Sequence, residues 1–165
     1  MRAVIMGVAG SGKSSIGLAV ADALGTVYLD GDDLHPEANI AKMSSGIPLT
    51  DEDRAPWLDR VGTTLGQQPD GSMIGCSALR RIYRDRIQAA AGQPVAFVHL
   101  AGAREVIERR MSEREGHFMP VALLDSQFAT LEPLGQDETG CVIDIDQDFS
   151  AVVGEAVAYL QSAAI

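Results

Sequence analysis

One short segment near the start of the sequence constrains the fold more than any other feature. Residues 7–14 read Gly-Val-Ala-Gly-Ser-Gly-Lys-Ser and match the phosphate-binding loop pattern G-x-x-x-x-G-K-[ST]. An apolar run at 2–6, typical of a buried strand, precedes the segment, and an apolar-rich stretch at 14–24, long enough for a helix, follows it. Because this loop joins a strand to a helix, its context supports the match and predicts a nucleoside triphosphate-binding protein.

The residue types of this loop suit a triphosphate. Glycines let the backbone curl so that several amide N–H groups point at one anion, and the helix that follows adds its positive N-terminal end. Lys13 is expected to reach the β- and γ-phosphates, and the Ser14 hydroxyl to ligate Mg²⁺. The predicted nucleotide-binding residues of the loop are Gly7, Val8, Ala9, Gly10, Ser11, Gly12, Lys13, Ser14 and Ser15.

Apolar runs recur along the chain between stretches with helical patterning. Strands are expected at 2–6, 26–30, 73–76, 95–100 and 141–145, and helices near 14–24, 51–66, 79–91, 103–114, 120–130 and 149–163. This alternation predicts an α/β fold, a parallel five-stranded sheet flanked by helices on both faces, with ligands at the carboxyl ends of the strands. No repeat or linker-like stretch divides the sequence, so residues 1–165 are expected to form a single P-loop NTPase domain.

Two stretches interrupt the alternation of strands and helices. Residues 31–56 follow the second expected strand, and residues 112–120 are polar, contain glycine and join two expected helices. Small kinases need two mobile parts, a cap that holds the acceptor and a lid that closes over the phosphates. A substrate cap is therefore predicted at about 31–56 and a lid at about 112–120, with plain surface loops as the alternative.

Carboxylates are concentrated where the second expected strand ends. Side chains alternate in an extended chain, so Asp30 and Asp32 are expected on the same side, facing the triphosphate. One would hold Mg²⁺, usually through water, and the other would accept a proton from an attacking hydroxyl. A GTPase would carry an N-K-x-D guanine-reading segment, which this sequence lacks. A regulatory ATP-binding module without an acceptor substrate stays open as an alternative, although the acidic pair counts against it.

The charge balance narrows the class of partner. With 13 Lys and Arg against 23 Asp and Glu, the net charge of −10 argues against nucleic acid or an anionic membrane as the main partner. Anionic ligands must then bind in local cationic pockets. Cys76 and Cys141 are too few and too widely spaced for a disulfide framework or a zinc site. The first expected strand follows Met1 almost directly, no apolar run could span a bilayer, and the protein is expected in the cytoplasm.

Longer stretches resemble one family of small-molecule kinases. Residues 29–43 read LDGDDLHPEANIAKM and are similar to the D-G-D-x-L-H-P-x-x-N-I-x-K-M signature of gluconate kinases. Residues 76–85 resemble the family's C-S-A-L-K-x-x-Y-R-D, with an arginine at position 80 in place of the usual lysine, and residues 114–118 and 126–133 also match. The likeness covers about residues 4–146 and is far more specific than the phosphate-binding loop alone.

The resemblance implies an activity and a fold. The implied reaction is transfer of the γ-phosphate of ATP to the 6-hydroxyl of D-gluconate, which gives 6-phospho-D-gluconate and ADP. The implied fold is that of the shikimate-kinase-like P-loop kinases, with Mg²⁺ accompanying ATP and often with a homodimer as the assembly. A related aldonate or shikimate on the same scaffold is the alternative acceptor.

Carried over by position, the resemblance gives the two carboxylates separate roles. Asp32 is the implied base or hydroxyl anchor, and Asp30 is the residue nearer the magnesium. His35 precedes a proline that favours a first helical turn, so it begins the cap, where its imidazole can hydrogen-bond a sugar hydroxyl. The predicted catalytic residues are Lys13, Asp32 and Arg114, and the predicted metal ligands are Ser14 and Asp30.

The resemblance also assigns roles to arginines. Arg110 falls where the family has a nucleotide-contacting arginine, and Arg114 where it has a lid arginine that closes over the phosphates. Three further arginines are implied contacts of the acceptor, whose carboxylate suits a planar guanidinium. The predicted substrate-binding residues are Asp32, His35, Arg54, Arg80 and Arg84.

Overall fold

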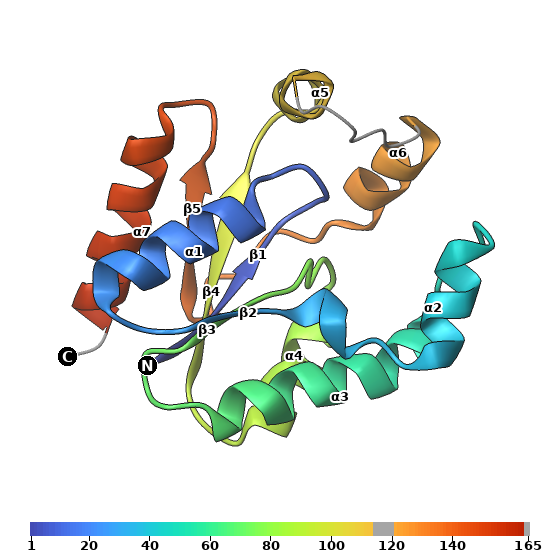
Figure 1. The fold of residues 1–165 in the computed structure, drawn as a ribbon, viewed down its shortest axis with the longest axis horizontal. Helices are drawn as coiled ribbons and strands as arrows, with labels where there is room; N and C mark the ends of the chain where they lie inside the picture. Colours follow the sequence, from blue (N-terminus) through green and yellow to red (C-terminus); the bar gives the residue numbers. More distant parts are fainter. Residues whose placement is uncertain (114–120, 164–165) are drawn as a thin grey trace.

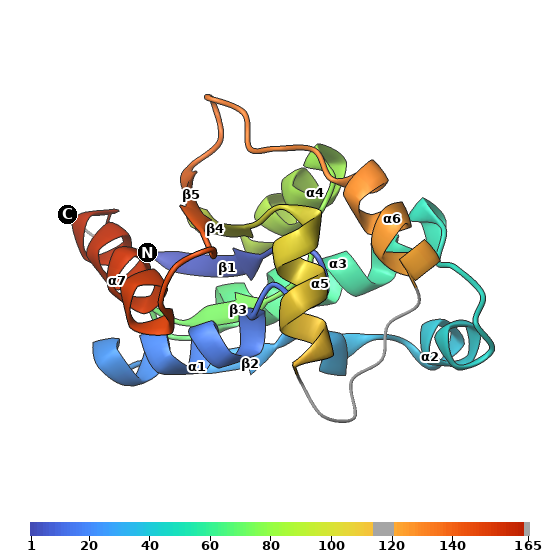
Figure 2. The same ribbon diagram turned by 90° about the horizontal axis from the view of Figure 1, so that it is seen from above.

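Five parallel strands form the centre of the molecule. The computed structural model describes residues 1–113 and 121–163, and its sheet has the strand order β2-β3-β1-β4-β5 (Figures 1 and 2). The strands are β1 (Arg2–Met6), β2 (Tyr28–Asp30), β3 (Met73–Gly75), β4 (Val95–Ala101) and β5 (Gly140–Asp144). The predicted five-stranded parallel sheet is therefore confirmed.

Helices connect the strands. They are α1 (Lys13–Leu24), α2 (Glu37–Ser44), α3 (Asp51–Gln67), α4 (Arg81–Ala91), α5 (Arg104–Ser112), α6 (Val121–Thr130) and α7 (Phe149–Ala163), with a short 3₁₀ helix η1 (Gly31–Leu34) after β2. α2 was not expected as a separate helix, because its sequence lies inside the predicted cap. Within the described residues, no helix is both long and apolar enough to cross a membrane.

Side chains of β1 alternate between two hydrophobic cores, because successive residues of a strand point to opposite faces. Ala3 and Ile5 pack in a core shared with α1 and α7, and Val4 and Met6 pack in a core shared with α3 and α4. All four are fully buried. Figure 1 shows the same two layers, with α1 and α7 on one side of the sheet and α3 and α4 on the other. Helices thus flank both faces, as predicted.

The segment predicted as a cap, residues 31–56, is largely helical. It comprises η1, α2 and the start of α3, and a hydrogen-bonded capping box between Thr50 and Asp53 begins α3. Lys42 of α2 lies 2.7 Å from the Asp53 carboxylate, which ties α2 to α3. Both views place α2 and α6 at the same end of the molecule. Most of the predicted lid, residues 114–120, lies outside the described residues.

Candidate active site

The phosphate-binding loop runs from the end of β1 to the start of α1. Gly10 and Gly12 adopt left-handed backbone conformations, with φ of 81° and 93°, which L-residues with side chains rarely adopt. Gly12 is the N-cap residue of α1 and has no side chain with which to cap the helix. The first amides of α1 are therefore left for a ligand, and the helix adds its positive end to the same place.

Lys13 folds back over this loop. Its Nζ donates hydrogen bonds to the carbonyl oxygens of Gly7 at 3.0 Å and Val8 at 3.1 Å. Burial lowers the pKa of Lys13, and the nearby carboxylates of Asp32 and Asp30 oppose that shift. The amine thus lies between the loop and the two carboxylates that the sequence predicted beside the triphosphate.

The two carboxylates lie at a turn instead of on an extended strand. β2 ends at Asp30, whose Oδ1 accepts a hydrogen bond from the Asp32 amide at 2.9 Å and so caps η1. The expected extended conformation beyond Asp30 is therefore wrong, although both side chains are exposed beside Lys13. Although the side chain of Asp32 is largely exposed, partial loss of surrounding water, with the Asp30 charge next, raises its pKa, while Lys13 and His35 oppose the rise. A raised pKa suits a carboxylate that takes up a proton.

The buried ring of His35 has a defined orientation beside Asp32. Asn39 Nδ2 donates to the Asp53 carbonyl at 3.0 Å, and because a carbonyl only accepts, this contact identifies the amide nitrogen. The same nitrogen lies 3.2 Å from His35 Nδ1, which must then accept a hydrogen bond. The proton of the neutral ring is therefore on Nε2, which lies 3.9 Å from Asp32 Oδ1.

Trp57 holds this arrangement against α3. Its ring stacks on His35 with centroids 4.1 Å apart, and its Nε1 donates to the Gly31 carbonyl at 2.8 Å. Burial lowers the pKa of His35, so the imidazole is neutral at pH 7. The structure places His35 next to Asp32, where it can orient the carboxylate; its predicted contact with the acceptor stays a prediction.

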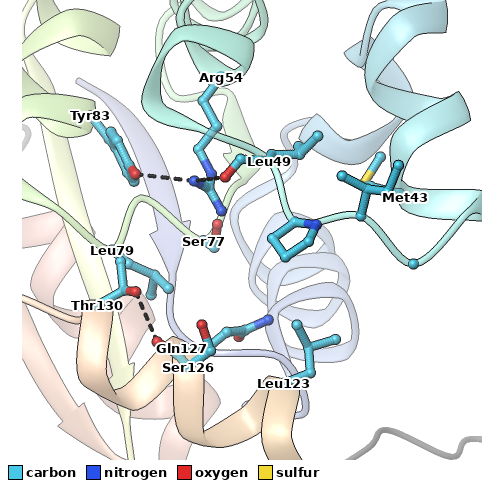
Figure 3. A pocket seen from close by; sticks show the side chains of 13 residues that line it. Met43, Leu49, Arg54, Ser77, Leu79, Tyr83, Leu123, Ser126, Gln127 and Thr130 are labelled. Atoms are coloured by element: carbon cyan, nitrogen blue, oxygen red, sulfur yellow. Dashed lines mark hydrogen bonds between the residues drawn. The ribbon is translucent and has the colours of Figure 1, made fainter.

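A cavity of about 340 Å³ lies between the predicted cap and α6 (Figure 3). Arg54 is its charged lining residue within the described part of the chain, and no carboxylate lines it there. Most of the other polar lining residues carry hydroxyl groups. The lining residues are Met43, Gly46, Ile47, Pro48, Leu49, Arg54, Ser77, Leu79, Tyr83, Leu123, Ser126, Gln127 and Thr130.

Arg54 is the predicted acceptor contact that the structure places in this cavity. Its Nη1 donates to the Leu49 carbonyl at 2.7 Å and to the Tyr83 hydroxyl at 3.2 Å (Figure 3). Among the described residues, its Nε and Nη2 have no hydrogen-bond partner. The guanidinium is therefore held in place through one nitrogen and retains two others for a ligand.

Arg80 lies beside the 340 Å³ cavity and lines a second cavity of about 430 Å³, which Arg54 and Tyr83 also line. Its guanidinium contacts Asp51 at 2.7 Å and Glu132 at 3.3 Å. The Tyr83 hydroxyl also hydrogen-bonds to Asp51. Two carboxylates thus already balance the charge of Arg80, and we interpret it as a link between α3, the start of α4 and the segment after α6.

Arg84 does not line the cavity that contains Arg54. Its side chain is 1% exposed, and its guanidinium contacts Glu138 at 2.7 Å and the Ala78 carbonyl at 2.8 Å. Ala78 has a φ of 48°, in the left-handed region that is strained for an alanine. The predicted role of Arg84 as an acceptor contact is therefore not supported; instead it holds the strained turn beside Ser77, which does line the cavity.

A third cavity, of about 300 Å³, adjoins the other side of the phosphate-binding loop. Arg110 lines it with Gly10, Ser15 and Phe149. Arg110 donates to the Ile145 carbonyl, and its aliphatic part and the Phe149 ring give this cavity a surface suited to a nucleotide base. The structure thus places Arg110 beside the loop, and its predicted contact with the nucleotide stays a prediction, whereas Arg114 lies outside the described residues.

Tyr28 is a residue of this site that the sequence reasoning missed. Its ring lies against Gly17 of α1 and Gly75 of β3, where a Cβ at either position would overlap it. The hydroxyl lies near the side chain of Ser14, and burial raises the pKa of Tyr28 to about 12. The signal that could have found it is glycine inside a helix and inside a strand, where glycine is otherwise unfavourable.

The donor set fits a magnesium ion that travels with ATP. The Ser14 hydroxyl, in the first turn of α1, and the Asp30 carboxylate, at the end of β2, are both exposed. Within the described residues, no group of three or more His, Cys, Asp and Glu side chains could hold a metal. Mg²⁺ in such sites takes one or two protein oxygens and completes its octahedron with water and phosphate oxygens. Ser14 and Asp30 therefore remain the residues that would hold it.

Comparison with known proteins gives consistent relatives, although no family model matches. The chain is 50% identical over 154 residues to the thermosensitive gluconokinase of Escherichia coli K12, covering 90% of this chain and 81% of that protein. It is 41% identical over 162 residues to the gluconokinase of Gluconobacter oxydans 621H, with 96% and 90% covered. The crystal structure of a gluconokinase from Sinorhizobium meliloti 1021 superposes with a TM-score of 0.90 at 46% identity, covering 98% of this chain and 92% of that one.

A more distant likeness concerns the fold alone. Shikimate kinase from Aquifex aeolicus superposes with a TM-score of 0.62 at 14% identity, covering 99% of this chain and 98% of that one.

Proposed function

The chain belongs to the gluconokinase family and is an ATP-dependent kinase that phosphorylates gluconate, and from this premise we propose which residues carry the reaction. The reaction transfers the γ-phosphate of ATP to the 6-hydroxyl of D-gluconate. The acceptor binds in the cavity between residues 31–56 and α6, and ATP binds at residues 7–15, with its base beside Arg110.

The charge of the acceptor cavity is the observation that carries this assignment. The chain has a net charge of −10, yet the described lining of this cavity contains Arg54 and no carboxylate. Nε and Nη2 of Arg54 can bind a carboxylate in the planar geometry that guanidinium favours. The hydroxyl groups of Ser77, Tyr83 and Thr130 suit a polyol. The cavity therefore suits a sugar acid, because Arg54 can bind its carboxylate and the hydroxyl-bearing side chains can bind its hydroxyl groups.

Charge placement accounts for the phosphoryl transfer. Lys13 and the loop amides that have no partner in the fold bind the β- and γ-phosphates, whereas the amides of Gly7, Ala9 and Ser11 donate within the protein. Lys13 stabilises the charge that spreads over the transferring group. Ser14 and Asp30 would hold Mg²⁺, which would supply neutralisation of phosphate charge when bound with ATP. Closure of the segments around the cleft would exclude water, which would otherwise compete as acceptor. Arg114 keeps its predicted role at the phosphates as a proposal.

Asp32 is the proposed base. It lies beside Lys13 and its raised pKa favours uptake of a proton. The proton of the acceptor hydroxyl passes to an Asp32 carboxylate oxygen as the hydroxyl oxygen attacks the γ-phosphorus. The bond between the γ-phosphorus and the β–γ bridging oxygen breaks, and ADP leaves with that bonding pair. His35 Nε2–H lies 3.9 Å from Asp32 Oδ1, longer than a hydrogen bond, and a small approach of the two groups would let it orient that carboxylate.

An acceptor panel tests the proposal. ADP formation from Mg·ATP is measured with D-gluconate, other aldonates, shikimate and no acceptor. We expect turnover with D-gluconate, and Arg54→Ala should raise its KM about tenfold or more because a charge-assisted contact is lost. Arg86→Ala, which removes an exposed arginine paired with Asp59 on the outer side of α4, is the matched control and should leave KM unchanged. Preferred turnover of another acceptor, or equal effects of both variants, would contradict the assignment.

The assembly and location of the protein stay proposals. Its partner is the small molecule D-gluconate, and the acidic net charge supports neither a nucleic acid nor an anionic membrane surface as a partner. We propose a cytoplasmic protein and, from the family resemblance, a homodimer. Light scattering on the purified protein measures the mass, and a monomer at micromolar concentration would contradict the dimer.

A further inference from the structure

One side chain contacts both the phosphate-binding loop and the acceptor cavity. Gln127 of α6 accepts a hydrogen bond through Oε1 from the Ala9 amide at 2.7 Å, although the two residues are 118 positions apart. The same side chain lines the acceptor cavity with Arg54 and Ser77. Nothing in the proposed reaction above uses Gln127.

The contact with Ala9 fixes the orientation of the Gln127 amide. A backbone N–H only donates, so the atom that faces Ala9 is the oxygen, and the nitrogen with its two hydrogens lies on the other side. Within the described part of the chain, Nε2 has no hydrogen-bond partner. Figure 3 shows the amide end of Gln127 directed into the cavity, on the wall opposite Arg54. A donor anchored by the loop is thus presented to whatever occupies the cavity.

The two opposite walls then offer different groups. Arg54 carries a positive charge, and Gln127 offers a neutral donor next to the loop that binds phosphate. A carboxylate favours the arginine, whereas a hydroxyl oxygen is satisfied by an amide N–H. A sugar acid can meet both only if its carboxylate lies toward Arg54 and its hydroxyl end toward the loop. That is the polarity needed for a terminal hydroxyl to reach the γ-phosphate.

We propose that Gln127 is an acceptor-binding residue that sets this polarity: its Oε1 is held by the Ala9 amide, and its Nε2 donates to a hydroxyl oxygen at the end of the acceptor remote from the carboxylate. The inference rests on the proposed function. It also accounts for an amide at this position, because a carboxylate there would repel both an anionic acceptor and a triphosphate.

Two substitutions separate the two ends of the amide. Gln127→Glu keeps an oxygen for the Ala9 amide and removes the donor, whereas Gln127→Met removes both with little change in length. Gln161→Glu, an exposed position on α7, is the control for added charge. The affinities for D-gluconate and for ATP are measured separately by calorimetry, with melting temperature and wild-type turnover in parallel.

Gln127→Glu and Gln127→Met should each weaken D-gluconate binding about tenfold or more, with ATP affinity within about threefold of wild type and Gln161→Glu unchanged. Unchanged gluconate affinity in Gln127→Glu, with a lower melting temperature in Gln127→Met, would show that Gln127 is only a structural link and would overturn the inference. Absence of gluconate turnover by the wild-type protein would instead overturn the proposed function.

Discussion

The nucleotide-binding side and the acceptor-binding side of the proposed active site are built in different ways. On the nucleotide side, one continuous segment, residues 7–15, supplies the loop amides, the lysine and the hydroxyl. On the acceptor side, the cavity is lined from six places in the chain: α2, the connection between α2 and α3, α3 itself, the segment after β3, α4 and α6. The first side is therefore encoded locally, whereas the second exists only once distant segments have packed. We expect damage to the first to affect chemistry, and damage to the second to affect affinity or stability.

Lys13→Ala should have the largest effect and tests the nucleotide side. Loss of the amine beside the phosphates should lower kcat about 10³-fold, because preorganised charge at the transferring group is removed. Gluconate affinity, measured by calorimetry without nucleotide, should stay within about twofold. A near-normal kcat would contradict the separation of the two sides.

Arg84→Ala should have an effect of similar size in free energy, but on the stability of the fold and not on kcat. Removal of one partner of a buried ion pair leaves the Glu138 carboxylate uncompensated and should cost about 3–5 kcal/mol of unfolding free energy. Urea unfolding followed by fluorescence measures the loss. Under conditions where the variant is folded, the KM for gluconate should change less than about threefold. A tenfold higher KM with an unchanged unfolding midpoint would instead show that Arg84 binds the acceptor.

Asp32→Asn tests the proposed base, whose charge acts on Lys13 of the phosphate-binding loop. Loss of the base should lower kcat about 10²-fold and leave both substrate affinities within about threefold. A change confined to the gluconate KM would show that Asp32 is an anchor.

The pH profile gives a second reading of Asp32. Because its pKa is raised and the base must be ionised, wild-type kcat/KM should fall as the pH drops through a value above the ordinary range of an aspartate. This acidic limb should be absent in Asp32→Asn. A limb that persists in the variant would assign it to another group.

Tyr28→Phe should have the smallest effect. The ring still fills the space at Gly17 and Gly75, but Ser14 loses the neighbouring hydroxyl group. We expect about a threefold rise in the Mg²⁺ concentration that gives half-maximal turnover. Tyr159→Phe on α7 is the matched control, and equal Mg²⁺ dependence in both variants would contradict a role for Tyr28 in holding Ser14.

The difference between a continuous segment and a cavity built from distant segments also explains how much of the fold and site the sequence could predict. The sheet and the phosphate-binding loop followed from contiguous patterns, namely apolar runs and glycines at fixed offsets. The conformation after β2 did not follow, because the Asp30 side chain caps its own turn and ends the strand. A short-range contact of this kind competes with an extended chain and leaves no mark in the apolar pattern.

The arginines show a second limit of predicting the site from the sequence. Arg54 and Arg84 lie in similar sequence surroundings, each next to acidic residues, yet Arg54 lines the cavity and Arg84 is buried on Glu138, 54 positions away. Only the folded chain reveals that partner. Gln127 was visible in the family-like segment 126–133, but its contact with Ala9 joins segments 118 positions apart and could not be read from either one.

The acceptor cavity, in which Arg54 is the charged residue of the described lining, also has a consequence for how fast substrates arrive. Both ATP and gluconate are anions that must approach a protein with a net charge of −10, so long-range repulsion should slow their encounter with the cleft. Added salt screens charges separated by more than about 10 Å at 0.1 M, while contacts inside the cavity are screened much less. Moderate ionic strength should therefore accelerate capture of both substrates, the opposite of the behaviour of enzymes that attract their ligands from a distance.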